Sequence, residues 1–157
     1  MRVRPQLYGG ERMTYIGIDP GKHGAVAVMY SDGSITVMPM NERTMITVMR
    51  TLSGIPCRCC LEKVHAMPKQ GVASTFTFGE GYGYLKGVLE SFNISYQEIP
   101  PERWKKEFGL NTDKKKSIEV CRQLFPDVDL RPTERCRTDS SDMAEAVMMA
   151  EYARRKL

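Results

Sequence analysis

Short apolar runs, each followed by a turn signal, fill the chain from residue 13 to residue 40. These runs are MTYIGID (13–19), AVAVMY (25–30) and SITVMPM (34–40). Pro-Gly and Asp-Gly turns separate them, and turns this short join neighbouring strands in antiparallel order. We therefore expect a three-stranded antiparallel meander.

Helical spacing of apolar residues begins directly after this meander. Asn41 is a suitable N-cap, and Met45, Met49 and Leu52 recur at intervals of three and four residues. The run CRCCLEKV at 57–64 follows. Its continuous apolar character is typical of a central strand with a parallel neighbour.

The second half of the chain alternates helical and extended patterns and ends in helices. The expected elements are a helix at 73–92, a strand at 94–100, short helices at 102–110 and 113–125, and a last helix at 140–157. The complete order predicts an α/β fold, a mixed five-stranded sheet with an antiparallel meander plus parallel strands, flanked by helices. Residues 13–157 would form one domain, and residues 1–12, which show no periodicity, a flexible N-terminal tail.

Four glycines interrupt the expected helix at 73–92, at Gly79, Gly81, Gly83 and Gly87. Each glycine inside a helix costs about 1 kcal/mol relative to alanine. Their concentration indicates either a broken helix start or a face that another backbone approaches closely.

The composition is that of a folded domain. Of the 157 residues, 41% are hydrophobic and 27% charged, and no apolar stretch approaches the roughly 20 residues of a membrane helix. The amino-terminal segment lacks the pattern of a secretory signal, so we expect a cytoplasmic protein. The five cysteines are an odd number, which argues against a disulfide framework, and CRCC fits a buried strand better than a zinc site.

Positive charge is concentrated between residues 103 and 116. This segment carries six basic residues, Arg103, Lys105, Lys106, Lys114, Lys115 and Lys116. Two acidic residues oppose them, so the segment alone carries +4, which equals the formal charge of the whole chain. Such a run is either a solvated surface or a contact for a phosphate-rich partner.

Four acidic residues occupy the ends of the expected elements. Asp19 ends the first strand, Glu62 lies at the end of the CRCCLE run, and Asp139 and Asp142 stand three residues apart at the start of the last helix. Carboxylates that meet in the fold repel one another unless a cation lies between them. Oxygen ligands suit Mg²⁺, and residues three apart share one face of a helix. The alternatives are a turn former at Asp19 and helix-dipole partners at Asp139 and Asp142.

The motifs IGIDPG, LEKV and TDSSDMAEAV, in this order, resemble those of the RuvC family of Holliday-junction resolvases in the ribonuclease H-like superfamily. The resemblance covers residues 14–153. It implies that Asp19, Glu62, Asp139 and Asp142 bind one or two Mg²⁺ ions, with Mn²⁺ able to substitute. The implied activity is hydrolysis of phosphodiester bonds in four-way junctions and other branched DNA.

The resemblance also implies DNA contacts outside the metal site. Family lysines that contact the DNA backbone match Lys105 or Lys106 and the three lysines at 114–116. His65 stands where relatives commonly carry a phenylalanine that wedges into the junction. Phe76 and Phe78 are either substitutes for this wedge or core residues. Trp104 is expected in the core rather than as a stacking platform.

The family acts as a homodimer. The glycine-rich stretch from Gly79 to Gly87 is a candidate for the dimer face, and the alternative is that it packs against its own sheet. The departure at His65 favours a bacteriophage member with a broad range of branched substrates. Two alternatives remain at this stage. One is a ribonuclease H-like nuclease for RNA or RNA–DNA hybrids, and the other is a junction-binding protein without activity.

Overall fold

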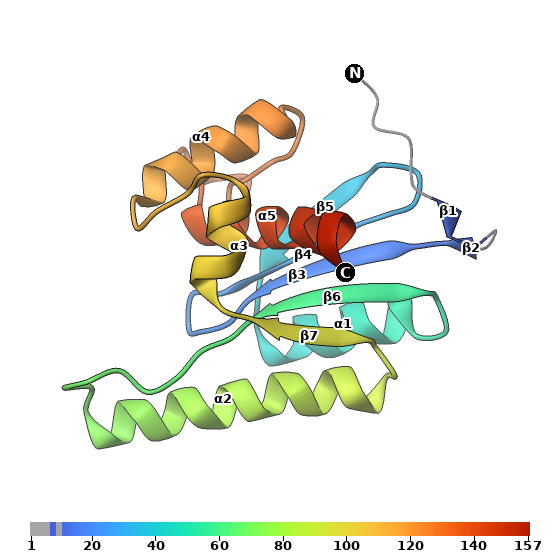
Figure 1. Ribbon diagram of the computed structural model, residues 1–157. Coiled ribbons are helices and arrows are strands. Elements are labelled where there is room, and N and C mark those ends of the chain that lie inside the picture. The colour runs from blue at the N-terminus through green and yellow to red at the C-terminus, as the bar shows by residue number, and fades with distance from the viewer. Residues whose placement is uncertain (1–6, 9–10) are drawn as a thin grey trace.

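A five-stranded mixed sheet forms the centre of the computed structural model, which describes residues 7–8 and 11–157 (Figure 1). In spatial order its strands are β5 (Ile35–Pro39), β4 (Ala25–Met29), β3 (Thr14–Asp19), β6 (Cys57–Glu62) and β7 (Tyr96–Ile99). The pairs β5–β4 and β4–β3 are antiparallel, and the pairs β3–β6 and β6–β7 are parallel. The expected meander and the central position of the cysteine-rich strand are confirmed, and with them the fold class.

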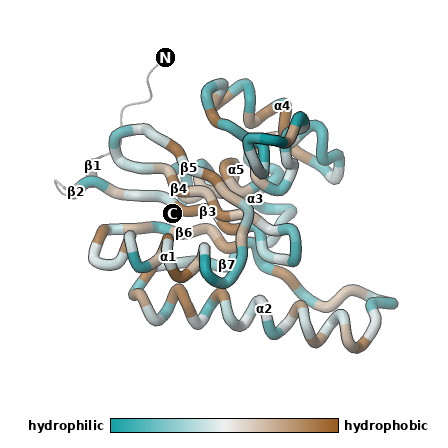
Figure 2. The backbone as a smooth tube through the Cα atoms, turned by 180° about the vertical axis from the view of Figure 1, so that it is seen from behind, coloured by the Kyte–Doolittle hydropathy of each residue, from teal (hydrophilic) through white to brown (hydrophobic). Residues whose placement is uncertain are grey.

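Helices cover both faces of this sheet (Figure 1). One face carries α1 (Glu42–Leu52) and α2 (Val72–Ser91), and the other carries α3 (Pro101–Glu107), α4 (Lys114–Leu124) and α5 (Ser141–Lys156). In the hydropathy colouring, the central strands are mostly hydrophobic and α4 is largely hydrophilic (Figure 2). None of the described helices is long and apolar enough to span a bilayer.

Strand alternation divides the apolar residues into two cores. Ile16 and Ile18 of β3 belong to the cluster under α1 and α2, whereas Tyr15 of the same strand belongs to the cluster under α5. On β6, Cys59 and Cys60 likewise face opposite sides. Successive side chains of a strand point to opposite faces, so the odd-numbered residues of β3 and the even-numbered residues of β6 face α5.

Helix α5 lies directly on the backbone of β3 at Gly17. A Cβ atom added at Gly17 would fall 2.0 Å from the carbonyl oxygen of Ala146 and 2.4 Å from the backbone nitrogen of Ala150. Every residue of α5 from Met143 to Ala153 is buried. Glycine in the strand and alanine in the helix therefore bring the start of α5 close to the ends of the central strands.

The first helix begins as its sequence predicts. The Asn41 side chain accepts a hydrogen bond from the backbone nitrogen of Thr44 at 2.9 Å, and Met45, Met49 and Leu52 are buried. The cysteines of β6 are also buried as expected, and all five cysteines are free.

Helix α2 is continuous through its four glycines. Its buried residues, Leu85, Val88 and Leu89, lie in its carboxyl-terminal half. A Cβ atom added at Gly79, Gly81, Gly83 or Gly87 would meet no described atom within 4 Å. The glycines thus neither break the helix nor contact another backbone within the described part of this chain.

The predicted tail at 1–12 is described only in part. Leu7–Tyr8 (β1) and Glu11–Arg12 (β2) pair in antiparallel order, and residues 1–6 and 9–10 lie outside the described residues.

A candidate metal centre at the carboxyl edge of the central strands

Asp19 and Glu62 lie at the same edge and on the same face of the sheet. In the parallel register, Ile18 pairs with Leu61, so the next residue of each strand is one of the two acids. Alternation directs both side chains toward α5. Two strands distant in sequence therefore bring the first two predicted carboxylates together.

The start of α5, on the sheet face toward which Asp19 and Glu62 point, adds further acidic residues. The Ser140 hydroxyl caps the helix by accepting a hydrogen bond from the backbone nitrogen of Met143 at 3.2 Å. Asp142 follows in the first turn, and Glu145 lies one turn further along the same helix face. One carboxylate oxygen each from Asp19, Asp142 and Glu145 lie within 4.8 Å of one another, and we call this group the acidic trio.

Two members of the acidic trio are shielded from water. Asp19 is 7% exposed and Glu145 is 2% exposed. Burial, with smaller contributions from the neighbouring charges of Glu62, Glu145 and Asp142, raises the pKa of Asp19 to about 9. Burial also raises the pKa of Glu62. The site therefore favours either a proton or a cation among these oxygens.

Glu62 is not a member of the acidic trio but is oriented by Trp104. The indole Nε1 donates a hydrogen bond to Glu62 Oε2 at 2.8 Å, which opposes the rise in its pKa. Trp104 is fully buried, so its expected place in the core is confirmed. The polar end of its ring also gives a direct contact to a predicted site residue.

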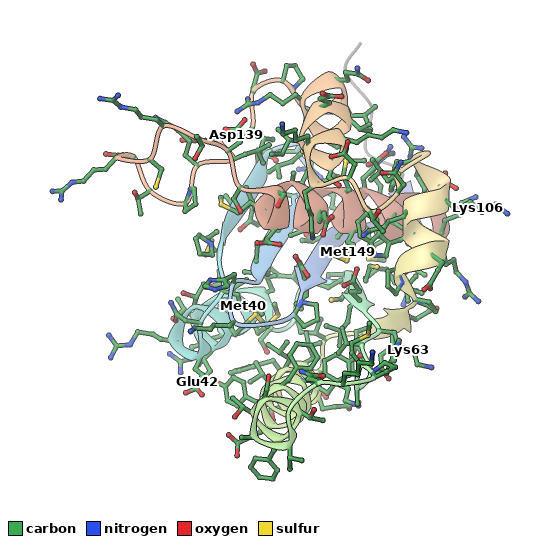
Figure 3. The ribbon with its side chains drawn as sticks, turned by 90° about the vertical axis from the view of Figure 1, so that its left-hand side faces the viewer. Met40, Glu42, Lys63, Lys106, Asp139 and Met149 are labelled. Atoms are coloured by element: carbon green, nitrogen blue, oxygen red, sulfur yellow. The ribbon has the colours of Figure 1, made fainter. Side chains whose placement is uncertain are left out.

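Asp139 faces α4 rather than the acidic trio. Its Oδ2 accepts hydrogen bonds from Arg122 Nε at 2.9 Å and Arg122 Nη2 at 2.7 Å. Figure 3 looks onto the edge where β3 and β6 end and shows Asp139 in the segment before α5. Its role as a metal ligand stays a prediction.

Two of the predicted DNA-contacting lysines reach into the site. Lys114 Nζ lies 3.0 Å from Glu145 Oε2 and 3.7 Å from Asp142 Oδ1. Lys105 Nζ lies 3.7 Å from Glu145 Oε1. The remaining predicted lysines have partly or fully exposed side chains: Lys106, Lys115 and Lys116. Figure 3 shows Lys106 on the outer side of α3.

The segment after β6 carries the other predicted DNA contacts. His65 is exposed, and Phe78 is half-buried on α2. Phe78 lines a groove of about 650 Å³ between the start of α2, the start of α1 and the turn at 20–22. Phe76, two residues before Phe78 on the same helix, is 70% exposed.

Glu145 is the site residue that the sequence analysis did not identify. It lies three residues after Asp142 inside the apolar run MAEAVMMA. A single charge within such an apolar run needs a partner in the fold. This argument, applied to the last helix, identifies Glu145 as a candidate site residue.

The acidic trio fits a hard divalent cation. All its donors are carboxylate oxygens, which Mg²⁺ and Mn²⁺ prefer. Oxygens that share one Mg²⁺ lie about 2.1 Å from it and so at most roughly 4.2 Å apart. The separations within the trio, up to 4.8 Å, need only small side-chain rotations to meet that limit.

Comparison with known proteins relates this chain to others through its fold. No protein-family model matches the sequence, and no curated protein matches it. Among solved structures, T. thermophilus RuvC in complex with a Holliday junction substrate is similar with a TM-score of 0.59 and 14% identity, over 88% of this chain and 90% of that chain. A second Thermus thermophilus RuvC structure is similar with a TM-score of 0.54 and 14% identity, over 88% and 91% of the two chains. The chain therefore has a RuvC-like fold.

Proposed function

We propose that this protein is a metal-dependent endonuclease that hydrolyses phosphodiester bonds in branched DNA, chiefly in four-way junctions. The observation that carries the proposal is the convergence of Asp19 with Asp142 and Glu145 from opposite ends of the chain. The similarity to a RuvC bound to a Holliday junction substrate supports the choice of DNA.

The carboxylates of this site share one task in the proposed reaction, which is to hold a divalent cation. Asp19, Asp142 and Glu145 would hold the cation, and Glu62 would complete the ligand set from the adjacent strand. When bound, the cation supplies Lewis-acid activation of water and neutralises charge on the scissile phosphate. Trp104 fixes the orientation of Glu62 through its N–H group. Arg122 binds Asp139 through Oδ2, and the role of Asp139 in the ligand set, predicted from its spacing, stays a prediction.

Lysines beside the acidic site provide the phosphate contacts in this proposal. Lys105 and Lys106 lie on α3, and Lys114, Lys115 and Lys116 form the first turn of α4. Both helices cover the sheet face that carries the carboxylates. Binding that depends on such contacts weakens steeply with salt, because each neutralised phosphate releases counterions.

We also propose a homodimer, in which two sites act on opposing strands of one junction. The glycines of α2 support this assignment, because no described atom occupies the space beside them and a second helix could approach closely. The proposed junction contacts come from the segment after β6 and the first half of α2, and they are His65, Phe76 and Phe78. A bacteriophage origin stays a prediction.

A panel of labelled substrates tests the proposed function. The purified protein is incubated with Mg²⁺ and a four-way junction, a fork, linear duplex or an RNA–DNA hybrid, and Asp19→Asn serves as the matched inactive variant. We expect paired nicks in the junction from the wild type and none from Asp19→Asn, with junction binding retained by both. Cutting of the hybrid alone would instead identify a ribonuclease, and binding without cleavage a junction-binding protein.

A further inference from the structure

The Lys114 ammonium group lies among the carboxylates that are proposed to hold a metal ion. Its Nζ is 3.0 Å from Glu145 Oε2 and 3.7 Å from Asp142 Oδ1. The charge of Lys114 also acts on Asp19, whose pKa it lowers against the other influences. One positive charge thus faces all three members of the acidic trio.

The two lysines around Glu145 differ in their freedom to move. The Lys105 side chain is 18% exposed, and its Nζ lies 3.7 Å from Glu145 Oε1. The same oxygen accepts a hydrogen bond from the buried Ser117 hydroxyl at 3.2 Å. The Lys114 side chain is 55% exposed and projects from the first residue of α4. Glu145 is therefore held in place from the interior, and Lys114 is the cation that can swing out into solvent.

We infer that Lys114 is a resident counter-ion that a divalent metal ion must displace from Glu145 and Asp142. This inference rests on the metal-binding part of the proposed function. A metal ion on these oxygens would take the lone pairs that Lys114 now contacts and would repel the ammonium group. In the metal-free protein Lys114 compensates the acidic trio, and once released it lies at the mouth of the site, where a substrate phosphate would arrive.

Metal binding without DNA tests this inference. Free Mn²⁺ is measured by electron paramagnetic resonance during titration of the wild type, Lys114→Met and Lys156→Met. Lys156 is a matched control, because its side chain is 50% exposed and pairs with Glu107 at 3.5 Å near the far end of α5. Loss of a competing cation should tighten Mn²⁺ binding by Lys114→Met roughly tenfold, whereas Lys156→Met should match the wild type.

A second readout is stability in EDTA. Lys114→Met leaves the acidic trio uncompensated, so it should unfold at a lower temperature than the wild type without metal and gain more from saturating Mn²⁺. If this variant does not fold, Lys114→Gln replaces it, because the amide is neutral yet can still donate to Glu145.

The outcomes separate this inference from the proposed function. Mn²⁺ affinity that is unchanged or weaker in the Lys114 variants, with a wild type that binds Mn²⁺, overturns the displacement and leaves the metal site standing. A wild type that binds no Mn²⁺ overturns both.

Discussion

Asp19→Asn should stabilise the metal-free protein while removing its response to metal. The pKa of Asp19 is raised from 3.8 to about 9, chiefly by burial, so between these values the folded protein holds a proton that the unfolded chain has released. The free energy of unfolding of the wild type therefore falls as pH rises through this window, at a rate of at most about 1.4 kcal/mol per pH unit. Asparagine has nearly the same shape and no such titration.

The advantage of Asp19→Asn should consequently grow with pH. From pH 5 to pH 8, the free energy of unfolding of Asp19→Asn relative to that of the wild type should rise by at most about 4 kcal/mol. Because water and side-chain movement relax a buried charge in the folded state, we expect roughly 1–3 kcal/mol of this limit to be observed. In saturating Mg²⁺ the order should reverse, since a ligand at 100 times its dissociation constant stabilises the wild type by about 3 kcal/mol.

Urea unfolding in EDTA at pH 5 and pH 8, repeated with Mg²⁺, measures these differences. Asp129→Asn is the control, because Asp129 is exposed and its pKa is lowered through hydrogen bonds from Arg131. That variant should respond to Mg²⁺ as the wild type does. The electrostatic account of the site would be refuted if Asp19→Asn were less stable than the wild type in EDTA at pH 8. It would also be refuted if the stabilities of Asp19→Asn and the wild type fell equally as the pH rises.

Four further substitutions, one of them a control, test the packing and the ligand set. Gly17→Ala should lower the free energy of unfolding by about 1–3 kcal/mol, because the added Cβ would overlap the backbone of α5. The control Gly79→Ala, in open space on α2, should raise the free energy of unfolding by about 1 kcal/mol. Equal urea midpoints for the two variants would contradict the packing of α5 on β3. Trp104→Phe removes the N–H donor to Glu62, so junction cleavage should fall while circular dichroism shows an intact fold; full activity would mean that the hydrogen bond does not orient Glu62. Glu145→Gln should weaken Mn²⁺ binding at least tenfold in the same titration used for Lys114, and an unchanged affinity would remove Glu145 from the ligand set.

The sheet and the first two carboxylates could be predicted because their signals are local. Asp19 and Glu62 each end an apolar run of strand length, and the alternation of side chains directs both to one face. The buried Trp104 followed from its residue type, but its contact with Glu62 depends on how α3 returns over the sheet, which no local pattern encodes.

Long-range contacts explain the parts of the site that sequence reasoning did not reach. Asp139 and Asp142 share a helical spacing, yet Arg122, 17 residues before Asp139, holds that side chain against α4. Glu145 joins the site because Gly17 lets α5 lie on β3, a contact between residues about 130 positions apart in the chain. Helical spacing gives the face of a residue, whereas the partner on that face is decided by tertiary packing.

The central claim is that Asp19, Asp142 and Glu145 jointly hold one divalent cation. Anomalous diffraction from crystals soaked in Mn²⁺ measures this directly. The account predicts a peak in contact with a carboxylate oxygen of each of the three residues, with the Lys114 ammonium group moved away. A peak bound elsewhere, or crystals that take up no Mn²⁺ at these oxygens, would contradict it.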